Sequence, residues 1–142
     1  MDCCGGGTVL LYSCSGAADV GCIADRVTRA LSREKVGRMT CLSGVGARLS
    51  GFIASAQGAD RNIVIDGCPI ACAQKGLEAI GVVPEVYNLA NYGCKKGDTP
   101  ISDELIEELT LKLKEDIMNK SLSLSSAADT QGTGGCSCGG NC

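Results

Sequence analysis

Four short segments along the chain are predicted to form β-strands, and the first of them has the continuous apolar pattern of a strand buried on both faces. The first is a continuous apolar run that leads into Cys14, Ser15 and Gly16. The third, Ile-Val-Ile-Asp, leads directly into Gly67. The four predicted strands are residues 8–13, 38–41, 63–66 and 82–89.

Between these strands, apolar residues recur at the spacing of amphipathic helices. A first helix is predicted over residues 17–37 and a second over 45–56. A third begins with Pro69 at its first position, which places Cys68 at the cap and Cys72 one turn later. Ser102 is suited to cap a last helix, in which acidic residues come first and lysines last, up to Lys120. The residues expected to face the core are Val20, Ile23, Ala24, Val27, Ala30 and Leu31 in the first helix, Val45, Leu49, Phe52, Ile53 and Ala56 in the second, and Ala73, Gly76, Leu77 and Ile80 in the third.

Alternation of strands and helices predicts an α/β fold: a small open, mainly parallel sheet of about four strands with flanking helices. The pattern does not determine the order of the strands. The expected organisation is a Cys/Gly leader over residues 1–7, the α/β domain over 8–119, and a Ser/Gly linker with a flexible, Cys-rich tail over 120–142.

Charge and hydropathy exclude several classes of partner. The chain has 142 residues and a formal net charge of -3, with dispersed positive residues, so we expect neither nucleic acid nor an anionic membrane as partner. No apolar run approaches the roughly 20 residues of a membrane span, and nothing at the start resembles a signal peptide. We therefore expect a cytoplasmic protein. The oligomeric state stays open.

The cysteine content is the anomaly in this composition, with eleven cysteines and no histidine. In a reducing compartment such an excess points to metal or redox chemistry rather than to a disulfide framework. Without histidine there is no Ser/His/Asp or Cys/His machinery within the chain, and a soft-metal site must be rich in thiolates.

Four of the cysteines follow predicted strand ends. Cys14 follows the first strand, Cys41 ends the second, and Cys68 and Cys72 follow the third. Because the carboxyl ends of parallel strands share one edge of a sheet, these thiols are expected to converge there and to bind Zn²⁺ as a tetrahedral four-thiolate site. Asp66 is a candidate hydrogen-bonding neighbour of the ligands, although its more ordinary use is turn formation before Gly67.

Two of the four, Cys14 and Cys68, precede predicted helix N-termini, which stabilise a thiolate. They are therefore candidate nucleophiles as well as ligands. The simpler interpretation of any one of the four is a small buried thiol of the core. Cys22 and Cys94 are taken as incidental, and Asp19, Asp25, Lys95 and Lys96 as solvated surface.

Three segments carry a resemblance to a known family: CSGAADVGCIADRVTRAL, RMTCLSGVGA and IVIDGCPIACAQKGLEAIGV. Over about residues 8–98 the chain resembles the DGC domain, a family of small proteins described as zinc-binding and named for the triplet seen here as Asp66, Gly67 and Cys68. The resemblance implies that Cys14, Cys41, Cys68 and Cys72 chelate zinc, and it implies no reaction.

The remaining cysteines lie outside this resemblance: Cys3 and Cys4 in the leader, and Cys136, Cys138 and Cys142 in the tail. A flexible linker of about 16 residues has a reach of roughly 20 Å, so we expect the tail to visit the site. Mobile thiols beside a sheltered cluster suggest capture of a soft metal, a metalloid or persulfide sulfur. The alternative is an accessory metal-scavenging tail without a link to the domain.

The sequence thus leaves three hypotheses of function. The first is a zinc-binding module that handles a soft metal or metalloid. The second is an enzyme of thiol-redox or sulfur transfer with Cys14 or Cys68 as nucleophile. The third is a protein in which zinc only holds loops together. A phosphate site is disfavoured, because the turn after the first strand lacks both a P-loop lysine and the arginine of cysteine-dependent phosphatases.

Overall fold

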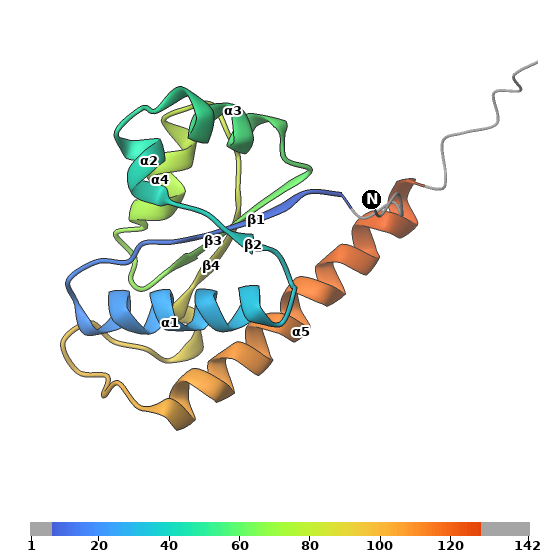
Figure 1. Ribbon diagram of the computed structural model, residues 1–142. Helices are drawn as coiled ribbons and strands as arrows, with labels where there is room; N and C mark the ends of the chain where they lie inside the picture. Colours follow the sequence, from blue (N-terminus) through green and yellow to red (C-terminus); the bar gives the residue numbers. More distant parts are fainter. Residues whose placement is uncertain (1–6, 129–142) are drawn as a thin grey trace, which may run out of the picture.

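The computed structural model describes residues 7–128, and its side chains are described as far as Ser123. It contains one four-stranded sheet with helices on both faces (Figure 1). The strands are β1 (Val9–Ser13), β2 (Arg38–Met39), β3 (Arg61–Asp66) and β4 (Glu85–Asn88). They are all parallel, in the order β2-β1-β3-β4, which confirms the predicted α/β class and supplies the order.

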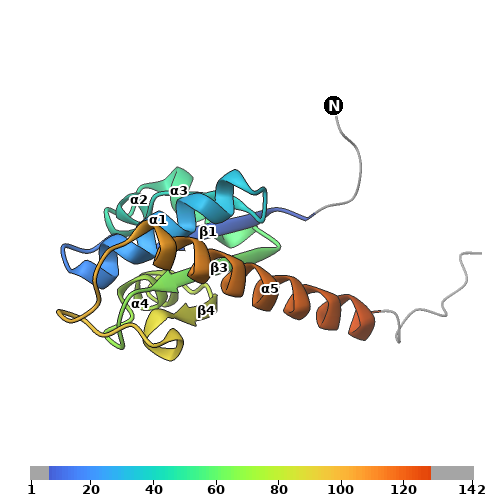
Figure 2. The same ribbon diagram turned by 90° about the horizontal axis from the view of Figure 1, so that it is seen from below.

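Two groups of helices cover the two faces of the sheet, as both views show (Figures 1 and 2). On one face lie α1 (Asp19–Arg33) and α5 (Asp103–Ala128). On the other lie α2 (Leu42–Gly46), α3 (Ser50–Gly58) and α4 (Cys72–Glu78), and a 3₁₀ turn, η1 (Leu89–Tyr92), follows β4.

Alternate residues of the central strands point into two separate cores, as the two-residue period of a strand requires. Leu11, Ile63 and Ile65 pack with α1 and α5. Leu10 and Tyr12 pack with the helices of the other face. Both central strands are thus buried on both sides, which explains their continuous apolar sequence. The predicted stripe of α1 is confirmed at Val20, Ile23, Ala24, Val27 and Leu31, which are all buried, whereas Ala30 is half-buried.

The predicted second helix is wrong in one respect, because the chain forms two helices there. Arg48 takes a left-handed conformation, with φ at 58°, between α2 and α3. The turn lets Phe52 pack against Gly44 so closely that a side chain at Gly44 would lie 2.6 Å from the ring. Leu49, expected in the core, is 52% exposed as a result.

Other boundaries also differ from the prediction. β2 and β4 are shorter than expected, although Thr40 continues the pairing of β2 by donating its N–H to the carbonyl of Leu11. Ser102 caps α5 as predicted, since its Oγ accepts from the N–H of Leu105 at 3.2 Å. However, α5 runs past Lys120 to Ala128. None of the helices within residues 7–128 combines the length and the apolar character that crossing a bilayer requires.

Candidate functional site

The structure places the four predicted site cysteines on the loops that leave the carboxyl edge of the sheet. Cys14 directly follows β1, Cys41 follows β2 and precedes α2, Cys68 follows β3, and Cys72 opens α4. Cys14 and Cys68 are half-buried, whereas Cys41 and Cys72 are exposed. All four are free thiols, so each is available for chemistry.

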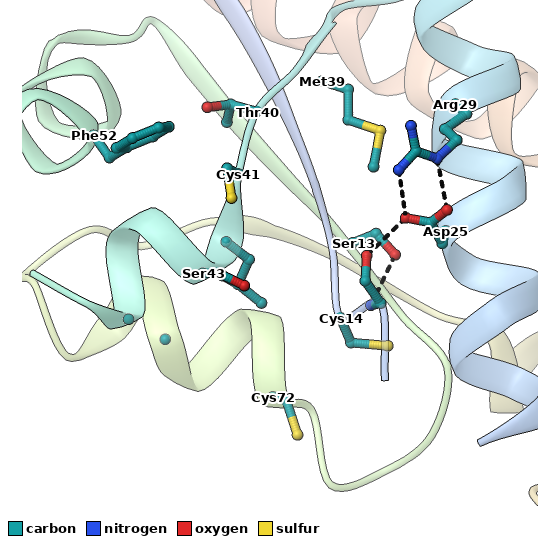
Figure 3. A pocket seen from close by; sticks show the side chains of 14 residues that line it. Ser13, Cys14, Asp25, Arg29, Met39, Thr40, Cys41, Ser43, Phe52 and Cys72 are labelled. Atoms are coloured by element: carbon teal, nitrogen blue, oxygen red, sulfur yellow. Dashed lines mark hydrogen bonds and ion pairs between the residues drawn. The ribbon is translucent and has the colours of Figure 1, made fainter. Parts of the chain in front are cut away.

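These cysteines line two pockets that share Cys14 and Cys72. The larger pocket has a volume of about 840 Å³ and also contains Cys41 (Figure 3). The smaller one, of about 430 Å³, lies between the loops after β1 and β3 and contains Cys68. Since β1 and β3 are neighbours whose following connections leave toward opposite faces, this crevice is where open parallel sheets bind ligands.

The sulfur of Cys14 is held in place by the loop after β3. The backbone N–H of Gly67 donates to Cys14 Sγ at 3.4 Å. Burial raises the pKa of the Cys14 thiol, and hydrogen bonds from Gly67 and Gly16 offset this only in part. The expected stabilisation of the Cys14 thiolate by the start of α1 is therefore outweighed by desolvation.

The turn from Cys68 to Ala71 replaces the first helical turn that Pro69 predicts. The N–H of Ala71 donates to the carbonyl of Cys68 at 3.1 Å, and Ala71 has a left-handed φ of 55°. Asn88 Nδ2 also donates to the carbonyl of Cys68, at 2.7 Å. The prediction that Cys68 caps a helix is thus wrong, since α4 begins only at Cys72.

Asp66 holds the N-terminus of α4. Its two carboxylate oxygens accept the backbone N–H groups of Ala73 at 2.9 Å and Gln74 at 3.0 Å. The side chain is 1% exposed, so these charge-assisted bonds are shielded from water. Through this contact Asp66 fixes Cys72 relative to β3.

Gly67 is required by a close approach of two loops. A Cβ atom at this position would lie 2.5 Å from the carbonyl oxygen of Val20, in the first turn of α1. Each residue of the Asp-Gly-Cys triplet therefore has a structural role. Asp66 caps α4, Gly67 allows the close contact with α1, and Cys68 lies on a turn that Asn88 holds by a hydrogen bond.

The thiols are not oriented toward a common point, as the ligands of a metal ion would be. Within residues 7–128, no group of three or more Cys, Asp or Glu side chains is arranged to hold a metal ion. Figure 3 shows the sulfurs of Cys14, Cys41 and Cys72 directed to different points around the larger pocket. The donor types suit zinc, but the side chains as placed do not fit it.

A polar wall of the larger pocket was missed by the sequence analysis. Asp25 accepts hydrogen bonds from Ser15 Oγ at 2.8 Å and from Arg29 Nε at 2.6 Å (Figure 3). Partial burial raises the pKa of Asp25, but these bonds and the charge of Arg29 outweigh it and lower the pKa. Only the i, i+4 spacing of Asp25 and Arg29 signals the pair in sequence. Nothing there signals the pocket.

The accessory thiols Cys3, Cys4, Cys136, Cys138 and Cys142 lie outside the described residues. The starting point of the tail is nevertheless defined. α5 passes the amino end of β3, where the carbonyl of Ile117 accepts from Arg61 Nη2 at 3.3 Å, and it ends beyond that edge, opposite the four site cysteines (Figure 1).

The first part of the predicted linker is helical, because α5 runs to Ala128. The 26 residues of α5 span about 39 Å. The prediction that the tail visits the site concerns residues outside the described part of the chain, and it stays a prediction.

Comparison with known proteins gives one family and one curated relative. Residues 10–113 match the family described as the DGC domain. The chain is also 32% identical over 88 residues to the anaerobic and virulence modulator AnvM of Pseudomonas aeruginosa, an alignment that covers 61% of this chain and 67% of that protein. No solved structure matches the chain.

Proposed function

The chain belongs to the DGC domain family, and from this premise we propose that it binds a soft metal ion, zinc in the first place, through Cys14, Cys41, Cys68 and Cys72. One observation carries the proposal. Four free thiols from three separate loops surround two pockets that share Cys14 and Cys72 at the carboxyl edge of a parallel sheet.

The chemistry of the donors supports zinc over harder metals. With no histidine in the chain, the site offers thiolates, which favour Zn²⁺ and other soft ions over Mg²⁺ or Ca²⁺. Bound zinc would tie the three loops together. Asp66, which anchors the first turn of α4, would keep Cys72 in place.

Binding in this form requires a local rearrangement of the thiols. Cys41 and Cys72 are exposed and can change rotamer at little cost. Cys68 lies on the turn that ends at Ala71, whose left-handed backbone is unfavourable for alanine. This turn is the segment we expect to move when the fourth sulfur approaches the other three.

The experiment is native mass spectrometry of the full chain with the five accessory cysteines replaced by serine. Replacement is preferable to truncation at residue 120, which would cut α5. We expect about one tightly held zinc ion per chain, lost when Cys14, Cys41, Cys68 or Cys72 is also replaced by serine. Cys22→Ser, which removes an exposed thiol outside both pockets, is the matched control. A folded protein that takes up no zinc would refute the proposal.

A second candidate function is thiol-redox or sulfur transfer with Cys14 or Cys68 as nucleophile. For Cys14 the larger pocket favours it, since a volume of about 840 Å³ beside this thiol admits a small substrate, whereas Cys68 lines the smaller pocket. Alkylation near pH 6 separates the two functions. Fast labelling of one thiol supports catalysis, and equal protection of all four on addition of zinc supports a closed metal site.

The free thiols support a proposal for the cellular setting. We place the protein in the reducing cytoplasm, with a soft metal, metalloid or sulfur species as its partner, because all six cysteines of the described part of the chain are free. The name of the relative AnvM describes a modulator and specifies no reaction, which is compatible with a binding module.

A further inference from the structure

The larger pocket has two chemically different ends with thiols between them. At one end are Asp25 and Arg29, together with the hydroxyl groups of Ser13 and Ser15. The aromatic ring of Phe52 lies at the opposite end, with Thr40 and Ser43 on the same side of the pocket (Figure 3). A pocket of about 840 Å³ is within the range of roughly 300–1,000 Å³ that holds small organic ligands, and it is far larger than a metal ion needs.

A network of hydrogen bonds holds the charged end of the pocket in place. Asp25 accepts from both Ser15 and Arg29, and the N–H of Ser15 donates to Ser13 Oγ at 3.2 Å. These bonds connect the charged pair to the segment that carries Cys14. Ser15 takes a left-handed φ of 43°, a backbone conformation that turns the chain here.

Asp25 presents a negatively charged acceptor to the larger pocket, and Arg29 presents positively charged donors to it. Arg29 uses Nε and Nη2 on Asp25. A guanidinium has five N–H donors, so within the described part of the chain others remain for a ligand. Its side chain is 58% exposed and that of Asp25 is 23% exposed, so both are accessible to a ligand. Such a pair matches the ammonium and carboxylate of an α-amino acid.

We propose that this pocket binds a small thiol that carries an α-amino-acid head group, with the head at the Asp25–Arg29 pair and the sulfur among the three thiols. The ligand is free cysteine or a short peptide that contains it. The inference rests on the proposed function in one respect: Cys14, Cys41 and Cys72, which receive the ligand's sulfur, belong to the proposed metal site.

The thiols explain why a sulfur side chain is selected. Three cysteines and Met39 line the pocket, and polarisable sulfur groups favour a sulfur-bearing side chain over a hydroxyl of similar shape. The volume beyond the thiols, toward Phe52, leaves room for further residues of a peptide.

The test is calorimetric titration of the full chain, metal-free and kept reduced with a phosphine, with four probes. L-cysteine has all three groups, cysteamine lacks the carboxylate, 3-mercaptopropionate lacks the amine, and L-serine lacks the thiol. We expect L-cysteine to bind at least about tenfold more tightly than each of the others. Equal affinity of L-cysteine and any one of the three overturns the inference.

Variants assign this discrimination to the charged pair. In the double variant Asp25→Asn, Arg29→Met, L-cysteine should bind no better than cysteamine. The control is Arg26→Met, which removes another α1 arginine, one that pairs with Asp103 outside the pocket. It should leave the preference unchanged, and preference retained in the double variant overturns the assignment.

Zinc uptake, measured separately by native mass spectrometry, distinguishes the two proposals. The double variant should bind zinc with unchanged stoichiometry, because it keeps all four cysteines. Discrimination among the probes without any zinc uptake would support this inference while refuting the proposed metal function. Zinc uptake without discrimination among the four probes would support the proposed metal function and refute this inference.

Discussion

The N–H of Gly67 donates a hydrogen bond to Cys14 Sγ over 3.4 Å, joining two loops that are 53 residues apart in sequence. This contact sets the distance between the loops that carry Cys14 and Cys68, and it gives Cys14 a structural role besides its proposed role as ligand.

The contact can be tested with two substitutions at Cys14. Cys14→Ser retains an acceptor for the N–H of Gly67, whereas Cys14→Ala leaves that buried donor without a partner. We expect the alanine variant to be less stable than the serine variant by roughly 0.5–1 kcal/mol, measured by urea denaturation. Equal stabilities would mean that the sulfur contact contributes nothing. Both variants should lose zinc.

Gly67→Ala should destabilise the fold by at least about 1–3 kcal/mol, because the new Cβ would lie 2.5 Å from the carbonyl oxygen of Val20 and the two loops would have to separate. Gly16→Ala is a control from the same crevice, since a Cβ there meets nothing within 4 Å. Thermal unfolding of the two variants measures the difference, and similar melting temperatures would contradict the close approach.

Asp66→Asn should cost about 1.5–3 kcal/mol of the free energy of unfolding. The carboxylate accepts two backbone N–H groups, and an amide has only one oxygen to replace its two acceptors. The exposed Asp98, changed to asparagine, should stay within about 0.5 kcal/mol of the wild type. Urea denaturation compares the two, and a silent Asp66→Asn would show that α4 needs no cap.

Ala71→Gly tests whether the turn from Cys68 to Ala71 moves on metal binding. Glycine relieves the left-handed backbone, so the metal-free protein should gain up to about 1 kcal/mol, and zinc affinity should fall by a matching factor of about five. Arg48→Gly relieves the same conformation between α2 and α3, so it should stabilise the protein without affecting zinc. Competition with a chelator measures the affinity, and an unchanged value for Ala71→Gly would mean that the turn stays as it is.

Glu85→Gln should lower the free energy of unfolding at neutral pH, and this difference from the wild type should disappear in acid. Hydrogen bonds from Arg61, at 2.7 and 2.9 Å, lower the pKa of Glu85 from its ordinary 4.5. A lowered carboxyl pKa contributes stability above the ordinary value that disappears as the pH falls through the lowered one. Urea denaturation at about pH 7 and about pH 3 should show the difference closing. The exposed Glu108, changed to glutamine, should show little difference at either pH.

Part of the site is local in origin and could therefore be predicted. Cys14, Cys41, Cys68 and Cys72 follow strands whose apolar pattern is visible in the sequence, and parallel strands bring their carboxyl ends to one edge. The start of α4 could not be predicted in this way. Pro69 favours a helix, but Asp66 and Asn88, which come from two strands, bind the backbone on either side of the turn and hold it in another conformation.

The sequence by itself determined the α/β class, the parallel sheet and the edge on which the thiols gather, because strand and helix periodicity and turn residues act over a few neighbouring positions. Only the tertiary structure decided the order of the strands, the orientation of the sulfurs, the polar wall of Asp25 and Arg29, and the edge from which the tail departs. Each of these depends on contacts between segments far apart in the chain, whose energies no local pattern of residues encodes.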